Sequence, residues 1–222
     1  TASSGNHGAA LSMAVSRLGS TTKVVMPNNT PKAKVLNVER NGGEIIWCNP
    51  NQSSRERVLK TQKEKSGSVL VHPYNDKRIV AGQGTVAKEF LEDLPKLDMI
   101  VSPVSGGGLL AGTLFSVNHI NPKIKVYGSE PEEADDAYRS VKSGKILSNK
   151  TTNTICDGLR AQIGTITFPI IKDKVERIIT VSEKDIIAAT RMIWERLKII
   201  VEPSCAITLS IELNNKDLFI DK

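Results

Sequence analysis

The sequence has 222 residues, 39% hydrophobic and 24% charged, which is ordinary for a globular protein. Aromatic residues make up 4%, and the net charge of +6 comes from scattered basic residues, which argues against a nucleic-acid partner. No apolar run approaches the roughly 20 residues that span a bilayer, so we expect no membrane partner. The three cysteines, Cys48, Cys156 and Cys205, lack disulfide or metal-ligand spacing, so we expect reduced thiols in a cytoplasmic protein.

Short β-rich runs alternate with helical stretches along the chain. Strands are predicted at residues 23–26, 44–48, 69–71, 99–103, 125–130 and 177–181. Helices are predicted at residues 7–18, 31–41, 53–65, 80–94, 109–119 and 185–197. This alternation predicts an α/β fold, in which helices cover both faces of parallel sheets.

Helix starts and a domain boundary are also readable. Ser53 and Ser182 are predicted N-caps with acidic residues three positions later, and Gly19 and Gly42 are predicted to follow helix ends. A turn-forming cluster at residues 72–76 predicts a boundary between a small domain, residues 1–74, and a large domain, residues 75–222.

A glycine-rich loop joins the predicted strand 99–103 to the following helix. It contains Ser105, Gly106, Gly107, Gly108 and Leu109. Glycines let a backbone approach an anion closely, and the first N–H groups of a helix point toward it. The loop therefore predicts a phosphate cradle, with a tight turn that holds no ligand as the alternative.

A second polar loop opens the chain, at another helix start. It contains Ser3, Ser4, Gly5, Asn6 and His7. Hydroxyl, amide and backbone N–H groups suit a carboxylate, while helix capping by Ser3 or Ser4 is the alternative. By residue type, His7 is predicted to pack or cap rather than to catalyse.

Carboxylates gather in residues 130–136, after a predicted strand. Such a cluster, with a backbone carbonyl, suits Mg²⁺ or Ca²⁺. From the spacing alone, an acidic first helical turn that complements the helix dipole is the favoured interpretation. Farther along, Glu202 lies at a turn before Pro203, where it is either a site residue or an N-terminal helix charge.

Together, and in this order, these segments resemble fold-type II pyridoxal-phosphate (PLP) enzymes of the serine racemase and serine/threonine dehydratase family. The resemblance also rests on His72-Pro73, on Ala-Gly-Gln-Gly-Thr at 81–85, on Asp-Gly-Leu at 157–159, and on Trp-Glu-Arg at 194–196. It covers nearly the whole chain. It implies two open, twisted parallel-sheet domains with three αβα layers, PLP as cofactor, L-serine or L-threonine as substrate, and a homodimer.

The resemblance also implies roles for single residues. The substrate would be bound by Ser3, Ser4, Gly5, Asn6 and His7. The cofactor would be bound by Asn6, Tyr74, Ser105, Gly106, Gly107, Gly108, Leu109, Gly158 and Glu202. Glu130, Asp136 and the carbonyl of Ala134 resemble the family's cation site, which takes Mg²⁺, Mn²⁺ or Ca²⁺.

Ser4 is the predicted catalytic residue, because related enzymes that only dehydrate carry Ala at the matching position. PLP acts as an electron sink that acidifies the Cα proton of an amino acid. Racemisation also needs acid–base groups on both faces of Cα, and Ser4 would serve one of them. We therefore expect a serine racemase activity with a serine dehydratase side activity that yields pyruvate and ammonia.

Several departures qualify the resemblance. The segment with the lysine that carries the cofactor is expected upstream of Thr1, and a Ser-Gly-Gly-Asn segment is expected after Lys222, so we interpret the chain as cut at both ends. Ser105 replaces the first glycine of a tetraglycine loop. ATP is considered as an effector, although Ala9 and Asn41 differ from nucleotide-contacting residues of animal relatives, while Lys198 matches one.

Two further hypotheses remain open. A dedicated serine, threonine or 3-hydroxyaspartate ammonia-lyase on the same fold would form a keto acid and no D-amino acid. A pseudoenzyme or regulatory protein that kept the fold would form neither product.

Overall fold

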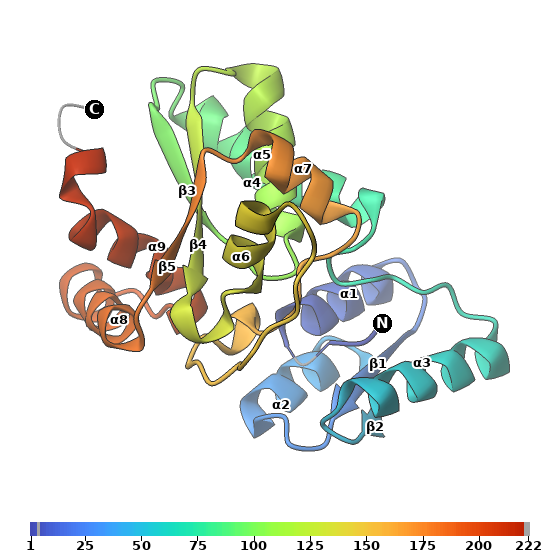
Figure 1. The fold of residues 1–222 in the computed structure, drawn as a ribbon. Helices are drawn as coiled ribbons and strands as arrows, with labels where there is room; N and C mark the ends of the chain where they lie inside the picture. The colour runs from blue at the N-terminus through green and yellow to red at the C-terminus, as the bar shows by residue number, and fades with distance from the viewer. Residues whose placement is uncertain (4, 220–222) are drawn as a thin grey trace. The chain divides into compact units, whose positions relative to one another are not determined.

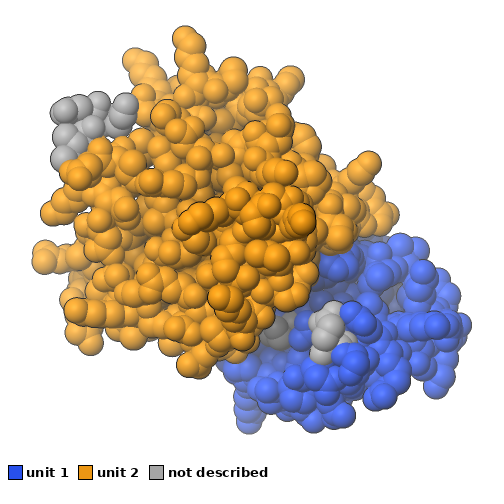
Figure 2. Space-filling view, in the orientation of Figure 1, with its two compact units in different colours: residues 1–73 blue, residues 74–222 orange. Residues whose placement is uncertain are grey.

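A computed structural model describes residues 1–3 and 5–219 (Figure 1). The described chain divides into two compact units, residues 1–73 (unit 1) and residues 74–222 (unit 2), as Figure 2 shows in two colours. Both units combine helices with a parallel sheet. The α/β class read from the sequence is therefore confirmed, and we keep as a proposal that the units correspond to the small and large domains.

Unit 1 has a two-stranded sheet. Strands β1 (Thr22–Pro27) and β2 (Gly43–Cys48) pair in parallel, with Val24 opposite Ile45. The helices are α1 (Asn6–Arg17), α2 (Lys32–Arg40) and α3 (Gln52–Ser66). Its buried core contains Ala9, Val24, Met26 and Val38, so β1 is held against α1 and α2.

The predicted strand at residues 69–71 is wrong for this structure. Residues 69–71 form no strand. Elsewhere in unit 1, Ala2 makes an isolated parallel bridge to Val25 on β1. A strand needs a hydrogen-bonded neighbour, whatever the β propensity of its residues. Among the described residues, no strand pairs with the segment 69–71.

Unit 2 has a three-stranded parallel sheet in the order β3-β4-β5. The strands are β3 (Met99–Pro103), β4 (Lys125–Pro131) and β5 (Arg177–Val181). The helices are α4 (Lys77–Asp93), α5 (Gly108–Ile120), α6 (Asp136–Ser143), α7 (Thr167–Lys174), α8 (Glu183–Leu197) and α9 (Pro203–Asn214). Short 3-10 turns lie at Glu132–Ala134, Asp157–Leu159 and Lys216–Leu218.

Alternating side chains bury both faces of this sheet. Ile100 and Ile178 belong to one buried cluster with residues of α4, α5 and α7. Val101 and Ile179 pack against a second cluster that contains Ile207 of α9. Because the side chains of a strand alternate between faces, helices on both sides are required, and the three αβα layers follow.

The helix ends follow capping chemistry, with one correction. Ser182 caps α8 as predicted, since its hydroxyl accepts a hydrogen bond from the Asp185 N–H at 3.3 Å. Ser53 does not cap α3, because that helix begins earlier and the Asn51 side chain accepts from the Ser54 N–H at 2.8 Å. Asn is as good an N-cap as Ser, and Asn51 holds the N-cap position, from which its side chain accepts from the free N–H of Ser54.

Candidate functional site

The glycine-rich loop of unit 2, predicted to cradle a phosphate, lies at the N-terminus of α5. Within the described chain, no hydrogen bond engages the N–H groups of residues 105–109. Gly107 has φ +87°, in the left-handed region that favours glycine. Five consecutive unpaired donors at the positive end of a helix suit a phosphate group.

Contacts from distant parts of unit 2 fix this loop. The Ser105 hydroxyl donates to the Ala161 carbonyl at 3.0 Å and accepts from the Ala161 N–H at 2.9 Å. The buried Thr167 hydroxyl donates to the Gly106 carbonyl at 2.6 Å. The Gly164 N–H donates to the same carbonyl at 3.1 Å. The conformation of the cradle is therefore fixed by hydrogen bonds within unit 2.

Tyr74 lies directly against the cradle. A Cβ atom added to Gly106 would lie 2.3 Å from the Tyr74 ring, and one added to Gly108 would lie 3.0 Å from the Tyr74 Cβ. The Asn75 carboxamide oxygen, next in the chain, accepts from the Ile166 N–H at 2.7 Å. These glycines are therefore required by close packing as well as by access to an anion.

Gly158 and Glu202 lie close together in a second part of unit 2. The Gly158 N–H donates to the Ser204 hydroxyl at 3.1 Å, and Ser204 is in the first turn of α9. Glu202 occupies the N-cap position of that helix. The structure thus brings the predicted cofactor residues Gly158 and Glu202 to one loop and helix start.

The predicted cation ligands lie at the end of β4, and both carboxylates are buried. Glu130 is fully buried and accepts hydrogen bonds from the N–H groups of Ala137 at 2.9 Å and Tyr138 at 2.7 Å. One oxygen of Asp136 accepts from the Ile163 N–H at 2.7 Å. The other, Oδ1, is buried and has no hydrogen-bond partner among the described residues.

Burial raises the pKa of Glu130 well above its usual range, despite the hydrogen bonds from Tyr138 and Ala137. Burial likewise raises the pKa of Asp136 to about 6. A divalent cation would stabilise both carboxylates in their charged form and would engage the free Oδ1. Among the described residues, no three His, Cys, Asp or Glu side chains lie together as metal ligands. A cation held by Glu130 and Asp136 would therefore need a further ligand of another kind, such as the carbonyl of Ala134.

The predicted substrate loop belongs to unit 1. The Ser3 hydroxyl accepts from the N–H groups of Gly5 at 3.3 Å and Gly8 at 3.1 Å, as the capping alternative predicted. Asn6 begins α1, and burial lowers the pKa of His7, whose Nε2 is buried without a hydrogen-bond partner among the described residues. Ser4 lies outside the described residues.

Sequence reasoning missed Lys34 and Thr167. A Cβ atom added to Gly5 would lie 3.4 Å from the Lys34 ammonium nitrogen, so this cation lies beside the substrate loop. Lys34 is in the first turn of α2, where the helix dipole disfavours a positive charge. A lysine at this unfavourable position is a feature of the sequence that could have indicated a functional role. Thr167 offered no signal, since its partner Gly106 is 61 residues away in the chain.

Comparison with known proteins identifies the family. Residues 1–219 match the family model described as "Pyridoxal-phosphate dependent enzyme". The chain belongs to this family. It is a serine racemase-like PLP enzyme of fold type II, as the sequence motifs indicated.

Individual relatives agree with this assignment. A serine racemase of Arabidopsis thaliana is 48% identical over 215 residues, which are 97% of this chain and 65% of the relative. A beta-hydroxyaspartate dehydratase of Paracoccus denitrificans is 42% identical over 222 residues, which are 100% of this chain and 70% of the relative. The structure of maize serine racemase superposes with a TM-score of 0.95 at 44% identity, over 97% of this chain and 66% of that one.

The chain therefore spans about 65% of the length of the Arabidopsis relative that it matches. Within the described residues of this PLP-family chain, no helix is both long enough and apolar enough to cross a membrane.

Proposed function

We propose that the protein containing this chain is a PLP-dependent serine racemase, which interconverts L- and D-serine and also converts serine to pyruvate and ammonia. The observation that carries the proposal is the loop at residues 105–109 with its free N–H groups, in a chain of the PLP-dependent family. Its five unpaired N–H groups match the phosphate that PLP carries. The identity to serine racemases of plants supports the choice of reaction.

The residues of unit 2 fit the cofactor by their chemistry. Residues 105–109 would hold the phosphate, and Tyr74 would contact the cofactor beside them. Gly158 and Glu202 would lie near the pyridine ring, and Asn6 of unit 1 would donate to the ring hydroxyl oxygen. When bound, PLP supplies the electron sink that makes the Cα proton of an amino acid acidic.

The residues of unit 1 would hold the amino acid. Ser3, Gly5, Asn6 and His7 would line the place of the substrate carboxylate, which hydroxyl, amide and N–H donors of this loop would bind. Ser4 would hold and deliver a proton at its Oγ on one face of Cα. A second acid–base group on the other face is needed for racemisation, because the proton leaves one face and returns on the other.

We also propose that Mg²⁺, or Mn²⁺ or Ca²⁺, binds at Glu130, Asp136 and the Ala134 carbonyl. The buried Asp136 Oδ1 without a partner supports this site, since an unpaired buried carboxylate oxygen is costly. We further propose a homodimer as the assembly, which light scattering of the intact protein tests.

The test uses the full-length protein with PLP and Mg²⁺ and supplies L-serine. D-serine and pyruvate are quantified in the same reaction. We expect both products from the wild type. Ser4→Ala should lower D-serine formation about 100-fold or more while pyruvate formation persists, as expected for loss of one acid–base group. Ser20→Ala, an exposed serine outside the loop, should change neither product. Pyruvate without D-serine from the wild type contradicts the racemase proposal.

Lys34 favours one second candidate, a 3-hydroxyaspartate dehydratase. Its ammonium beside Gly5 is suited to the additional carboxylate of an acidic substrate, and the Paracoccus dehydratase is similar over the whole chain. Comparing kcat/KM for L-serine and 3-hydroxyaspartate separates the two. A preference for 3-hydroxyaspartate that Lys34→Met removes, without D-serine formation, would favour this candidate.

A further inference from the structure

The first three residues of unit 2 each hold a different part of it. Tyr74 packs against Gly106 of the glycine-rich loop. Asp76 caps α4, since its carboxylate accepts from the Arg78 N–H at 2.8 Å. Asn75, between them, is hydrogen-bonded to a segment 91 positions farther along the chain. The role of Asn75 therefore depends on what this distant segment does.

The Asn75 carboxamide binds the turn that precedes α7 with both of its ends. Its oxygen accepts from the Ile166 N–H at 2.7 Å, and its nitrogen donates to the Thr165 hydroxyl at 3.0 Å. A Cβ atom added to Gly164 would lie 2.5 Å from the same oxygen, so the carboxamide is packed tightly against the turn. Ile166, at the N-cap position of α7, has no acceptor in its own side chain. Asn75 thus supplies the acceptor that the local sequence lacks.

The same turn holds the glycine-rich loop by the Gly106 carbonyl. This oxygen accepts from the Gly164 N–H at 3.1 Å and from the Thr167 hydroxyl at 2.6 Å. The Gly164 N–H is shared with the Thr167 hydroxyl oxygen, also at 3.1 Å, and all three residues are buried. Because these groups form one network with the turn, the turn that Asn75 fixes also fixes the Gly106 carbonyl.

The direction of this carbonyl determines the direction of a donor in the cradle. The Gly106 carbonyl and the Gly107 N–H belong to one planar peptide unit, in which they point in opposite directions. Among the described residues, no acceptor engages that N–H, which lies at the N-terminus of α5. A hydrogen bond weakens steeply as its angle departs from linear. The orientation of this peptide unit therefore decides how well its N–H binds an anion.

We propose that Asn75 is a positioning residue for the phosphate group of the cofactor. Its carboxamide holds the turn at residues 164–166, the turn holds the Gly106 carbonyl, and the shared peptide unit aims the Gly107 N–H at the phosphate. Asn75 acts through these groups rather than by contact with the phosphate. Because the phosphate is that of PLP, this role rests on the proposed function.

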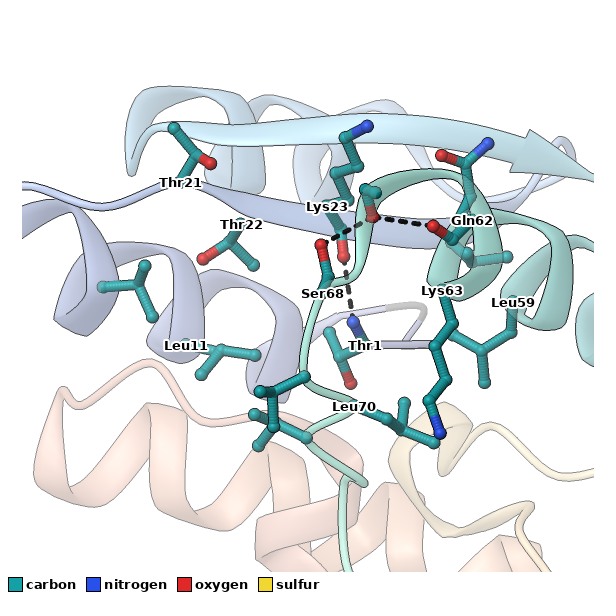
Figure 3. Close-up of a pocket in the computed structure, with 15 residues that line it drawn as sticks. Thr1, Leu11, Thr21, Thr22, Lys23, Leu59, Gln62, Lys63, Ser68 and Leu70 are labelled. Carbon is teal, nitrogen blue, oxygen red and sulfur yellow. Dashed lines mark hydrogen bonds between the residues drawn. The ribbon is translucent and has the colours of Figure 1, made fainter.

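Lysines elsewhere in the chain would attract a phosphate without any help from Asn75. Unit 1 contains a pocket of about 100 Å³ whose walls include Lys23, Lys63 and Ser68 (Figure 3). The ammonium groups of the two lysines favour an anion by charge alone. A phosphate bound in this pocket would respond to Lys63→Met and not to Asn75→Leu, so the two variants distinguish the two places.

The test uses the full-length protein freed of its cofactor. Equilibrium dialysis measures its Kd for PLP and for pyridoxal, which lacks the phosphate. Asn75→Leu removes both hydrogen bonds of the carboxamide and should weaken PLP binding about tenfold, because one charge-assisted hydrogen bond is misaligned. Pyridoxal binding should stay within about twofold, since the phosphate donors do not contribute to it. Asn153→Leu, at an exposed asparagine outside the network, should change neither Kd.

Two further variants separate positioning from a general loss of structure. Thr165→Val removes one of the two bonds of Asn75 and should weaken PLP binding about threefold. Thr167→Val removes the direct donor to the Gly106 carbonyl and should weaken it at least as much as Asn75→Leu. Because both act through that carbonyl, the double variant should lose less PLP affinity than the product of the two single losses.

Several outcomes would overturn the proposal. Equal weakening of PLP and pyridoxal binding by Asn75→Leu would indicate a general loss of structure, and unchanged PLP binding would show that the carboxamide has no effect. Multiplicative losses in the double variant would mean that Asn75 and Thr167 act independently. Loss of PLP affinity in Lys63→Met but not in Asn75→Leu would place the phosphate in unit 1. A wild-type protein that binds no PLP would overturn the proposed function and this role with it.

Discussion

The two units differ in how they distribute charge. Unit 1 contains ten Lys and Arg against four Asp and Glu, while unit 2 contains twenty of each, so the whole net charge of +6 belongs to unit 1. None of the helices α1, α2 and α3 has an acidic residue in its first turn. In unit 2, α6 and α8 have such residues, whereas α4, α5, α7 and α9 do not.

This difference teaches where anions are expected. An acidic residue in the first turn stabilises a helix by about 0.3–1 kcal/mol, so its absence from the seven described helix starts without one is a cost. The cost is offset where the free N–H groups receive an anionic ligand instead. Two helices of unit 2, α6 and α8, have acids in their first turns, and Asp136 of α6 is also a predicted cation ligand.

The two units can be compared experimentally because each contains one tryptophan, Trp47 in unit 1 and Trp194 in unit 2. A Trp47→Phe background reports unfolding of unit 2 by fluorescence, and a Trp194→Phe background reports unit 1. Both side chains are about half exposed, so neither substitution removes a buried core residue.

The largest effect is expected from Gly107→Ala. The added Cβ would lie 2.7 Å from Ile171 Cδ1 at a position with φ +87°, so unit 2 should lose about 3 kcal/mol of unfolding free energy. Denaturant titration in the Trp47→Phe background measures it. Gly82→Ala is the control, since nothing lies within 4 Å of its added Cβ and alanine favours the α4 interior. An equal loss in both variants would contradict the strain at Gly107.

The next effect concerns the cation. Mg²⁺ at roughly 30 times its Kd should raise the unfolding free energy of unit 2 by about 2 kcal/mol and leave unit 1 unchanged. EDTA should reverse the effect, and Asp136→Asn should abolish it, whereas the exposed Glu132→Gln should retain it. Stabilisation of unit 1 by Mg²⁺, or its persistence in Asp136→Asn, would show that the ion binds elsewhere.

A smaller effect is expected at the start of α3. Asn51→Ala removes the acceptor for the Ser54 N–H and should cost unit 1 about 1 kcal/mol, while Ser53→Ala should stay within about 0.5 kcal/mol. Urea unfolding in the Trp194→Phe background compares the two. The reverse order would restore Ser53 as the cap.

The smallest effect leaves stability unchanged and tests burial. Burial raises the pKa of Cys156 to about 11, so roughly one thiol in a thousand is ionised at pH 8. Burial also raises the pKa of Cys48. Iodoacetamide at pH 8 should therefore modify the exposed Cys205 first, as peptide mass spectrometry would show. Fast modification of Cys156 in the folded protein would contradict its burial.

The sequence predicted what local chemistry determines. The strands at 99–103 and 177–181 were predicted at the residues where they are found, because buried β-rich runs between turns have a clear pattern. The glycine-rich loop at 105–109 was found before a helix, as predicted, and its role as a phosphate cradle stays a prediction. Helix α6 was not predicted as a helix, since only its acidic first turn was considered, and α7, which contains Pro169, was missed entirely.

The remainder depends on contacts between residues far apart in the chain. Asn75 reaches Ile166 across 91 positions, and Ser105 reaches Ala161 across 56, which no local pattern reveals. The segment 69–71 shows the opposite case, since its local preference was read correctly but its neighbour decides whether a strand forms.

The pair of hydrogen bonds between Ser105 and Ala161 has a thermodynamic consequence. A loop that is already ordered loses little conformational entropy when its ligand arrives, so less of the interaction energy is consumed by ordering. Phosphate capture at residues 105–109 should then behave as association with a rigid receptor, in which affinity follows the quality of the contacts. The serine hydroxyl in a run of glycines thus restores the rigidity that glycine removes.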